Sequence, residues 1–419
     1  MVRRGTNPVR IGSYNQTVVL DAIRRSGGLS RVELAAATGL SAQAVTNICR
    51  RLLAAGFVQE AGTTNVGRGK PRTLLRLDAD ARLAVGVHVD PAVVSVGLLN
   101  LEGALLAEER VATPSALDPP RAIATITDAV DAAIAAGQAD RGRILGVGVA
   151  APGPVDLRRG VVANPPNLPQ WHHVPLRKDL AATTGLPVLL DKDVTAAAVA
   201  ETWWGSPGRG GTMAVLYIGT GIGVGLVVDG KVVRGSSGNA GEIGHVVVDP
   251  DGPYCACGQR GCVAVTVAPV ALVEQGRRAG VLDARTPSDT AGAVVALFDR
   301  ADAGDVVARG IVEDAAAGMA RLALVVTNLL DLDRLVLGGP FWSRLEPYYA
   351  GAVAGFRSGA AAHQIHDVEV VGTSFGEHFG AVGAASLVLD QAFSAHPTAL
   401  VEDLRDDSPR ARTRRAVAS

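Results

Sequence analysis

Cysteine is scarce in this 419-residue sequence, which contains only four. Long apolar runs are also missing, because charges, prolines or glycines interrupt each one before it reaches membrane-spanning length. Residues 1–16 carry early arginines without an apolar segment behind them, so they do not have the pattern of a signal peptide. These absences predict a cytoplasmic protein without a membrane partner. In that compartment a disulfide framework is not expected.

The composition is that of a well-buried globular protein, with 48% hydrophobic and 19% charged residues. The length predicts two or three domains. The net charge is only −1, but residues 1–80 contain twelve basic and five acidic residues (+7), which leaves −8 for the rest. A basic N-terminal segment on an acidic body favours a polyanionic partner for that segment alone. An arginine-rich solvated surface is the alternative explanation.

Residues 14–60 show the pattern of three short helices. The second helix is expected to begin at Ser30, because Glu33 completes the spacing of a capping box. Gly39 provides a left-handed stop for it, and Ser41 is a suitable N-cap for the third helix. Two helices joined by a short, glycine-containing turn form a helix-turn-helix.

The third helix would be the recognition helix of a DNA-binding domain. Its outer face is expected to present Gln43, Thr46, Asn47 and Arg50 to base edges and phosphates. The stretch after it alternates like a β-hairpin, and its basic tip carries Arg68, Lys70 and Arg72. Such a wing suits contact with the DNA backbone or minor groove. A helical hairpin beside a solvated loop is the simpler alternative, but helices, wing and local charge together favour a winged helix-turn-helix within residues 1–80.

The rest of the chain is expected to be an α/β body. Residues 81–109 show a strand–turn–strand–turn–strand scheme, and residues 213–234 repeat it. Such a repeat predicts two related halves, here two lobes at approximately 81–200 and 201–393. Helical segments between the strands support the α/β class. Residues 394–419 have charge runs without periodicity, so we expect a disordered tail.

Three of the four cysteines lie close together in "YCACGQRGC", residues 254–262. Cys255, Cys257 and Cys262, with His245 shortly before them, form a ligand set typical of a closed, tetrahedral structural Zn²⁺ site. Three cysteines cannot all pair in disulfides, and a redox loop is the weaker alternative. The remaining cysteine, Cys49, is expected to belong to the core of its helix.

The segment "GNAGEIGHVVVDPDGPYCACGQRGC" resembles the signature of the ROK family, whose name covers repressors, open reading frames and kinases. "NPPNLPQW", "DKDVTAAAVAE", "IGTGIGVGLVVDGKVVRG", "LVLGGP" and "SFGEHFGAVGAA" follow the usual order of the family, and the resemblance extends over residues 14–390. It implies an actin-like, ribonuclease-H-like fold of two lobes, a structural zinc on the His-plus-three-Cys set, and a sugar cleft between the lobes. An N-terminal winged helix-turn-helix marks the regulators of the family.

The resemblance also implies ligand-binding residues in the cleft: Asn167, Asp193, Glu242 and His245. Lys192, next to Asp193, is expected to contact the ligand as well. Asp193 stands at the position of the catalytic base in the kinases, although it could equally cap the helix that follows. Lys192 replaces the asparagine that usually precedes this aspartate. Ala264 replaces the glutamate expected two residues after the last cysteine. Both changes remove hydrogen bonds to an ordinary hexose, each worth about 1 kcal/mol.

The phosphate-binding turn of the first half departs further from the pattern of the kinases. Their Asp-x-Gly-Gly-Thr turn is replaced here by "HVDPA", residues 88–92. Pro91 has no N–H to donate, and Asp90 would repel a triphosphate. The second glycine-rich turn, "GTGIG" at 219–223, is intact, but glycines also serve ordinary tight turns.

The leading interpretation is therefore a transcriptional regulator, most often a repressor in this family. No residue is expected to be catalytic, and Asp193 would be a vestigial base. The kinase-like body would sense a sugar or sugar derivative, including an acidic sugar that pairs with Lys192. A homodimer or a dimer of dimers would bind operator DNA. The alternatives are an active ATP-dependent sugar kinase that carries a DNA-binding domain, and a regulator that senses zinc. The closed four-ligand site argues against the zinc sensor, because structural zinc binds too tightly to report fluctuations.

Overall fold

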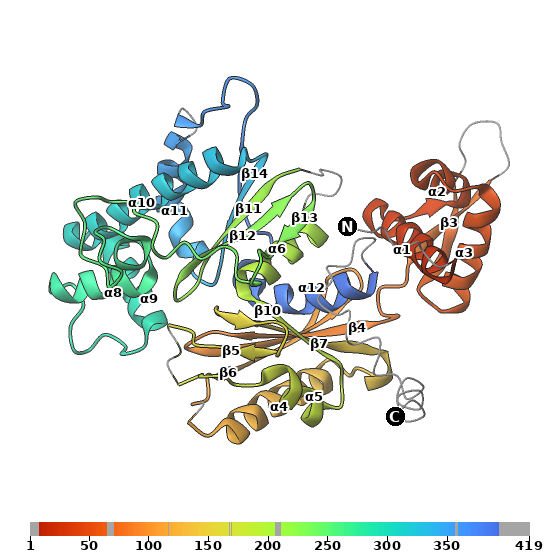
Figure 1. The fold of residues 1–419 in the computed structure, drawn as a ribbon, viewed down its shortest axis with the longest axis horizontal. Helices are drawn as coiled ribbons and strands as arrows, with labels where there is room; N and C mark the ends of the chain where they lie inside the picture. Colours follow the sequence, from red (N-terminus) through yellow and green to blue (C-terminus); the bar gives the residue numbers. More distant parts are fainter. Residues whose placement is uncertain are drawn as a thin grey trace, which may run out of the picture.

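The computed structural model describes residues 8–64, 71–115, 117–166, 168, 170–205, 211–356 and 359–393. It contains a small N-terminal unit of helices and a three-stranded sheet, followed by an α/β body with two five-stranded sheets (Figure 1). The sequence-based expectations for Arg68, Lys70, Asn167 and the segment 394–419 concern residues outside the described ranges. None of the described helices is both long and apolar enough to cross a membrane.

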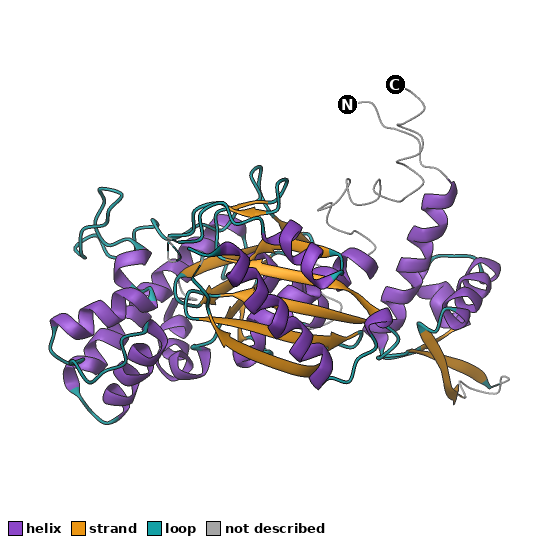
Figure 2. Ribbon diagram, turned by 90° about the horizontal axis from the view of Figure 1, so that it is seen from below, coloured by secondary structure: helices purple, strands orange, loops and turns teal. Residues whose placement is uncertain are grey.

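The N-terminal unit has the predicted winged helix-turn-helix pattern. Its elements are α1 (Pro8–Ser26), β1 (Leu29–Ser30), α2 (Arg31–Thr38), α3 (Ala42–Ala54), β2 (Val58–Thr64) and β3 (Arg72–Leu77). The Ser30 hydroxyl and the Glu33 carboxylate form the expected capping box, and Gly39 ends α2 with φ 69°. The Ser41 hydroxyl accepts a hydrogen bond from the backbone of α3. Strands β2 and β3 form a hairpin that projects beside the body (Figure 2).

The first sheet of the body has the strand order β10-β7-β4-β5-β6. Its strands are β4 (Leu83–Val89), β5 (Val93–Asn100), β6 (Leu105–Ala112), β7 (Ile144–Ala151) and β10 (Val188–Lys192). Helices α4 (Pro119–Ala136) and α5 (Leu176–Thr184) cover its outer face (Figure 1). The connection from β7 to α5 also contains the short strands β8 (Val155–Asp156) and β9 (Val161–Val162). Strand β4 is buried along its whole length, as expected for a strand covered on both faces.

The second sheet repeats this topology with the order β13-β12-β11-β14-β15. Its strands are β11 (Met213–Ile218), β12 (Ile222–Val228), β13 (Lys231–Val233), β14 (Arg334–Gly338) and β15 (Glu369–Gly372). In both sheets the first three strands pair antiparallel and the last two pair parallel beside the first. The strand–turn–strand repeat in the sequence therefore corresponds to two halves of the same architecture.

Further helices lie in the C-terminal part of the described chain. They are α7 (Val263–Thr266), α8 (Pro269–Arg278), α9 (Thr290–Asp302), α10 (Val306–Leu330), α11 (Trp342–Phe356) and α12 (Phe379–Phe393). Helices α8, α9 and α10 form a group beside the second sheet, whereas α12 returns to the first sheet (Figure 1). The core of the second half is continuous from the sheet into the helical group.

Helices α6 (Asp193–Trp204) and α12 lie between the two sheets. Small residues allow this arrangement, because the helix backbones approach the strands closely. A Cβ atom on Gly148 would lie 1.9 Å from the carbonyl oxygen of Ala384, and one on Gly225 would lie 2.1 Å from that of Val194. Glycine is thus required where α12 crosses the first sheet and where α6 crosses the second.

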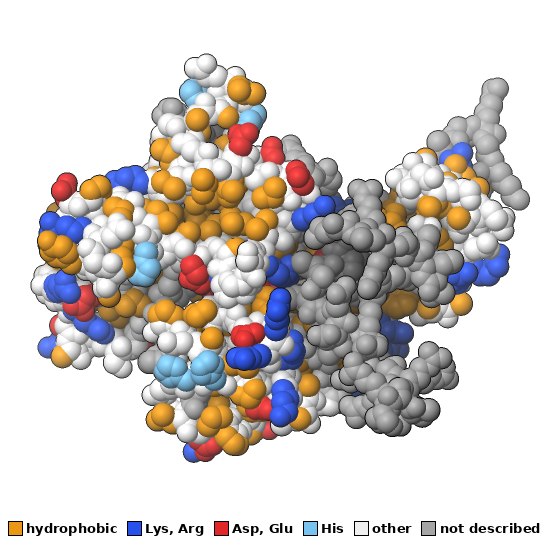
Figure 3. Space-filling model, viewed as in Figure 1, with side chains coloured by type: hydrophobic (Ala, Val, Ile, Leu, Met, Phe, Trp, Pro, Cys, Tyr) orange, Lys and Arg blue, Asp and Glu red, His pale blue; other side chains and the backbone are white. Residues whose placement is uncertain are grey.

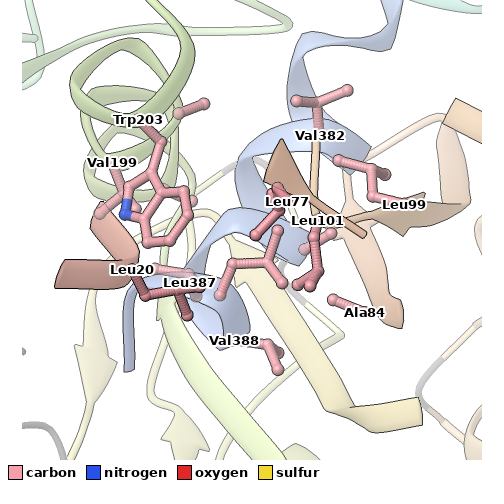
Figure 4. Close-up of a cluster of buried hydrophobic side chains, with 14 of the residues drawn as sticks. Leu20, Leu77, Ala84, Leu99, Leu101, Val199, Trp203, Val382, Leu387 and Val388 are labelled. Atoms are coloured by element: carbon pink, nitrogen blue, oxygen red, sulfur yellow. The ribbon is translucent and has the colours of Figure 1, made fainter. Parts of the chain in front are cut away.

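The N-terminal unit packs against the ends of these two central helices. Leu20 of α1 and Leu77 of β3 belong to one apolar cluster with Val199 and Trp203 of α6 and Leu387 of α12 (Figure 4). The side chains of this cluster are buried. The winged helix and the body therefore share a continuous apolar core.

Candidate functional site: a cleft between two sheets and a cysteine cluster

A cavity of about 300 Å³ opens where the two halves of the body meet. Its walls come from the turn between β4 and β5, the turn between β11 and β12, the start of α6, and residues 241–245. Asp90, Lys192, Asp193, Glu242 and His245 line it together. Four of the five residues expected to bind a ligand therefore surround one cavity, and Asn167 lies outside the described residues.

Lys192 lies at the end of β10, with only 2% of its side chain exposed. Its Nζ donates to Glu242 Oε1 at 2.6 Å and to the carbonyl oxygens of Ala240 at 3.1 Å and Asn239 at 3.4 Å. An ammonium group has three donors, so these acceptors use all of them. The ammonium is not free to pair with a ligand, which argues against the expected pairing of an acidic sugar with Lys192.

Asp193 is the first residue of α6. One carboxylate oxygen accepts the backbone N–H of Val194 at 2.7 Å. Burial raises the pKa of Asp193 to about 7, and the carboxylates of Glu242 and Asp90 act in the same direction. Lys192 is the N-cap of α6, so Asp193 is not the cap residue itself, although its carboxylate accepts one of the first backbone N–H groups of the helix. The group can exchange a proton near neutral pH.

The turn between β4 and β5 is tied to the turn between β11 and β12. The Thr220 hydroxyl lies 2.9 and 3.1 Å from the two carboxylate oxygens of Asp90. Asp90 also accepts the backbone N–H of Ala92 at 2.9 Å. The Thr220 hydroxyl therefore donates to the Asp90 carboxylate across the two turns. Pro91 lies in the cavity wall with them.

Just behind the first turn, His88 and Tyr217 form a buried pair. The Tyr217 hydroxyl lies 3.3 Å from His88 Nε2. Burial lowers the pKa of His88 and raises that of Tyr217. Both groups are therefore neutral near pH 7, and His88 does not supply a charge to the cleft.

The predicted zinc ligands lie together in the structure. The ligand atoms of His245, Cys255, Cys257 and Cys262 are all within 4.8 Å of one another. Cys255 Sγ lies 3.4 Å from His245 Nδ1, and Cys257 Sγ lies 3.6 Å from Cys262 Sγ. Thiolates about 2.3 Å from a tetrahedral centre are roughly 3.8 Å apart. The donor set and its spacing therefore fit a zinc ion.

The local backbone explains how the cysteines converge. Gly258 has φ 89° and Gly261 has φ 65°, conformations that favour glycine. A Cβ atom on Gly261 would lie 1.4 Å from the Asp249 carbonyl oxygen. His245 also lines the cleft, only three residues after Glu242. His245 therefore belongs both to the cysteine cluster and to one wall of the cavity.

The expected DNA-contacting residues occupy the winged helix as follows. On α3, Gln43 and Arg50 are exposed, whereas Thr46 and Asn47 are half-buried. Arg72 is half-buried and pairs with Thr64, the last residue of β2, at the tip end of the hairpin. Figure 3 shows basic side chains at the edge of this unit near α3.

A contact between the winged helix and α6 was not expected from the sequence. The Arg24 guanidinium of α1 lies 4.1 Å from the ring centroid of Trp203, and its Nη1 donates to the Trp203 carbonyl oxygen. The Trp203 indole N–H donates to Asp390 of α12 at 2.9 Å. Helix α6 therefore begins in the cleft between the two halves and ends beneath the winged helix. Arg24 and Trp203 are 179 positions apart in the sequence, so no local pattern could have revealed this contact.

Comparison with known proteins places both parts of the chain. The model of the ROK family matches residues 84–391, and that of the MarR family matches residues 13–69. The xylose repressor of Caldicellulosiruptor bescii is 30% identical over 61% of this chain and 64% of the repressor. The glucokinase of Thermotoga maritima is 32% identical over 58% of this chain and 79% of the kinase.

Solved structures support the same arrangement. A crystal structure described as a ROK family transcriptional regulator, homologous to the MLC protein of E. coli, has a TM-score of 0.74 and 22% identity. The likeness covers 92% of this chain and 97% of that one. The fold of the winged helix and the body together is therefore that of a solved protein.

Proposed function

Because this chain belongs to the ROK family and carries a MarR-type winged helix at its N-terminus, we propose that it is a ligand-controlled DNA-binding transcriptional repressor. The observation that carries the proposal is the course of α6, which starts with Asp193 in the cleft and ends with Trp203 beneath Arg24. A ligand in the cleft and DNA on the winged helix would thus act on the two ends of one helix. The protein would work in the cytoplasm, where its operator lies.

The winged helix would dock as in other helix-turn-helix proteins. Helix α3 would enter the major groove with Gln43, Thr46, Asn47 and Arg50, and the hairpin with Arg68, Lys70 and Arg72 would contact the backbone. A homodimer would bring two such helices to half-sites about 34 Å apart, or a multiple of that spacing. A buried α3 inner face of Val45, Ile48 and Leu52 supports this orientation, since it leaves the opposite face for DNA.

The body would sense a sugar or sugar derivative without phosphorylating it. Phosphoryl transfer depends on positioning and neutralising the phosphate oxygens. Here Asp90 brings a negative charge to the first turn and takes the Thr220 hydroxyl, while Pro91 lacks a donor. General base catalysis by Asp193 would contribute only about 10²–10⁴-fold and would not replace these missing interactions. The glucokinase relative makes an active sugar kinase the second candidate.

The cysteine cluster would hold a structural zinc. His245, Cys255, Cys257 and Cys262 would be the ligands, and a bound zinc would add its binding free energy to folding. Because Glu242 and His245 share one short segment, the metal would also position the Glu242 carboxylate in the cleft. We expect about one zinc per chain by metal analysis. The Cys257→Ser variant should lose zinc and bind its cleft ligand more weakly.

Coupling between the two sites gives the test of this function. An operator selected from random duplexes would be titrated with the full chain, with and without sugars, and followed by fluorescence anisotropy. We expect one class of sugar to change the apparent Kd by about 5–150-fold. The Arg24→Met variant should keep sugar binding and lose most of this change, whereas Arg278→Met on the distant helix α8 should behave like the wild type.

Two outcomes would contradict the proposal. One is unchanged DNA affinity after removal of residues 1–80. The other is selected DNA that binds tightly but with an affinity that no cleft ligand alters.

A further inference from the structure

We propose that the cleft recognises an amino sugar, with its ammonium group between Asp193 and Glu242. The inference rests on the proposed role of the cleft as a ligand site and specifies the chemical class of that ligand. It starts from the charges that line the cavity: the carboxylates of Asp90, Asp193 and Glu242 face it, and Lys192 is the one lysine in its described lining.

The Lys192 ammonium cannot receive an acidic ligand. Its three donors are used by two backbone carbonyls and Glu242 Oε1, and its side chain is buried. A carboxylate or phosphate on the ligand would have to displace Glu242, and would then leave that carboxylate without its cation. It would also enter a cleft where Asp90 and Asp193 already face it, so like charges oppose acidic sugars and sugar phosphates.

Two carboxylate oxygens remain available for a donor. Oε1 of Glu242 is held by Lys192, and no described residue donates to its Oε2. One oxygen of Asp193 accepts from Val194, and no described residue donates to the other. Glu242 lines the cavity and its side chain is 61% exposed, whereas its partner Lys192 is buried. Hydrogen bonds from an ammonium to carboxylates are stronger than those from a hydroxyl.

The geometry also predicts that protons are released when the ligand binds. The groups that face Asp193 are Lys192, Glu242 and Asp90, and the carboxylates together with burial hold its pKa near 7. A ligand ammonium beside Asp193 adds an opposite charge, which lowers that pKa. Asp193 is about half protonated at pH 7, so binding of an ammonium releases up to about half a proton from it, whereas binding of a neutral sugar does not.

Calorimetry with the full-length protein tests the proposal. Glucosamine, glucose, glucuronate and glucose 6-phosphate would be titrated at pH 7 in two buffers with different ionisation enthalpies. We expect glucosamine to bind about tenfold more tightly than glucose, with proton release, and the two acids to bind more weakly than glucose. The Asp193→Asn variant should lose the advantage of glucosamine and the proton release. Asp128→Asn, on the exposed face of α4, should retain both.

The result that overturns the proposal is tighter binding of either acid, equal binding of glucose and glucosamine, or no binding of glucosamine at millimolar concentration. The DNA titration separates this failure from failure of the proposed function. If another sugar alters operator affinity while glucosamine does not, the regulator remains and its amino-sugar specificity is wrong.

Discussion

The two sheets of the body have the same strand order and opposite chemistry where they meet the cleft. The first sheet contributes carboxylates, Asp90 after β4 and Asp193 after β10. The second sheet contributes the uncharged turn Gly219–Gly221, which contains the Thr220 hydroxyl. A shared topology therefore does not fix what a cleft binds, because a few turn residues decide its charge and its donors.

The turn between β4 and β5 also contacts the turn between β11 and β12. The Asp90 carboxylate accepts from Thr220 across the cleft, at the turn that would otherwise present its donors to an anion. This hydrogen bond joins the two halves, and we propose that the Asp90 carboxylate would also compete with phosphate for the Thr220 donor.

The Asp193→Asn variant tests how much the buried Asp193 carboxylate destabilises the folded protein. Burial raises the pKa of Asp193 from 3.8 to about 7 in the folded protein. The folded state therefore holds this proton more tightly than the unfolded state, and stability falls as the pH rises from about 4 to 7. Removing the charge should raise the free energy of unfolding by roughly 2–4 kcal/mol at pH 8 and by little near pH 4.

Urea denaturation at both pH values measures this effect. Asp128→Asn serves as the exposed control and should change neither value. A loss of stability in Asp193→Asn at pH 8 would contradict this prediction. It would show that neighbouring groups stabilise the ionised Asp193 carboxylate by more than burial destabilises it.

A double-mutant cycle on Asp90 and Thr220 tests the contact between the edges. The single changes Asp90→Ala and Thr220→Val each remove one partner of a hydrogen bond to a charged group. We expect a coupling of about 1.5 kcal/mol in the free energy of unfolding. A coupling within error of zero would mean that the two turns do not stabilise each other.

Exchange of the first turn tests whether its sequence prevents phosphate binding. The double variant Asp90→Gly/Pro91→Gly removes a negative charge and restores one backbone donor. We expect it to bind Mg²⁺-pyrophosphate about tenfold more tightly than the wild type by calorimetry, a change of about 1.4 kcal/mol. Equal affinity of the wild type and the double variant for Mg²⁺-pyrophosphate would show that Asp90 and Pro91 do not prevent phosphate binding.

Local patterns predicted most of the elements and all four cysteine-cluster ligands. Capping residues such as Ser30 and Glu33 act on their own helix, and His245 lies close in sequence to the cysteines. The pairing of Lys192 with Glu242 could not be predicted in this way, because it joins residues fifty positions apart. Before the partners are known, a lone lysine in a cleft suggests an anion-binding group.

The same reason explains the other omissions. The hydrogen bond of Asp90 to Thr220 and the contact of Arg24 with Trp203 depend on how distant segments pack. Helix α12 shows no amphipathic pattern in the sequence, because it is buried over Phe379–Leu389 except at Gly380. A segment that is apolar on every side does not show the periodicity of a surface helix.

Sugar-dependent consumption of ATP by the full-length protein tests the central claim most directly. The assay would contain Mg²⁺-ATP and a panel of neutral, amino and acidic sugars, with a sugar kinase of intact phosphate turns as the positive control. The account predicts background ATP consumption with every sugar, including those that alter operator binding. Turnover in the range of about 1–100 s⁻¹ typical of kinases would contradict it and identify the protein as an active sugar kinase.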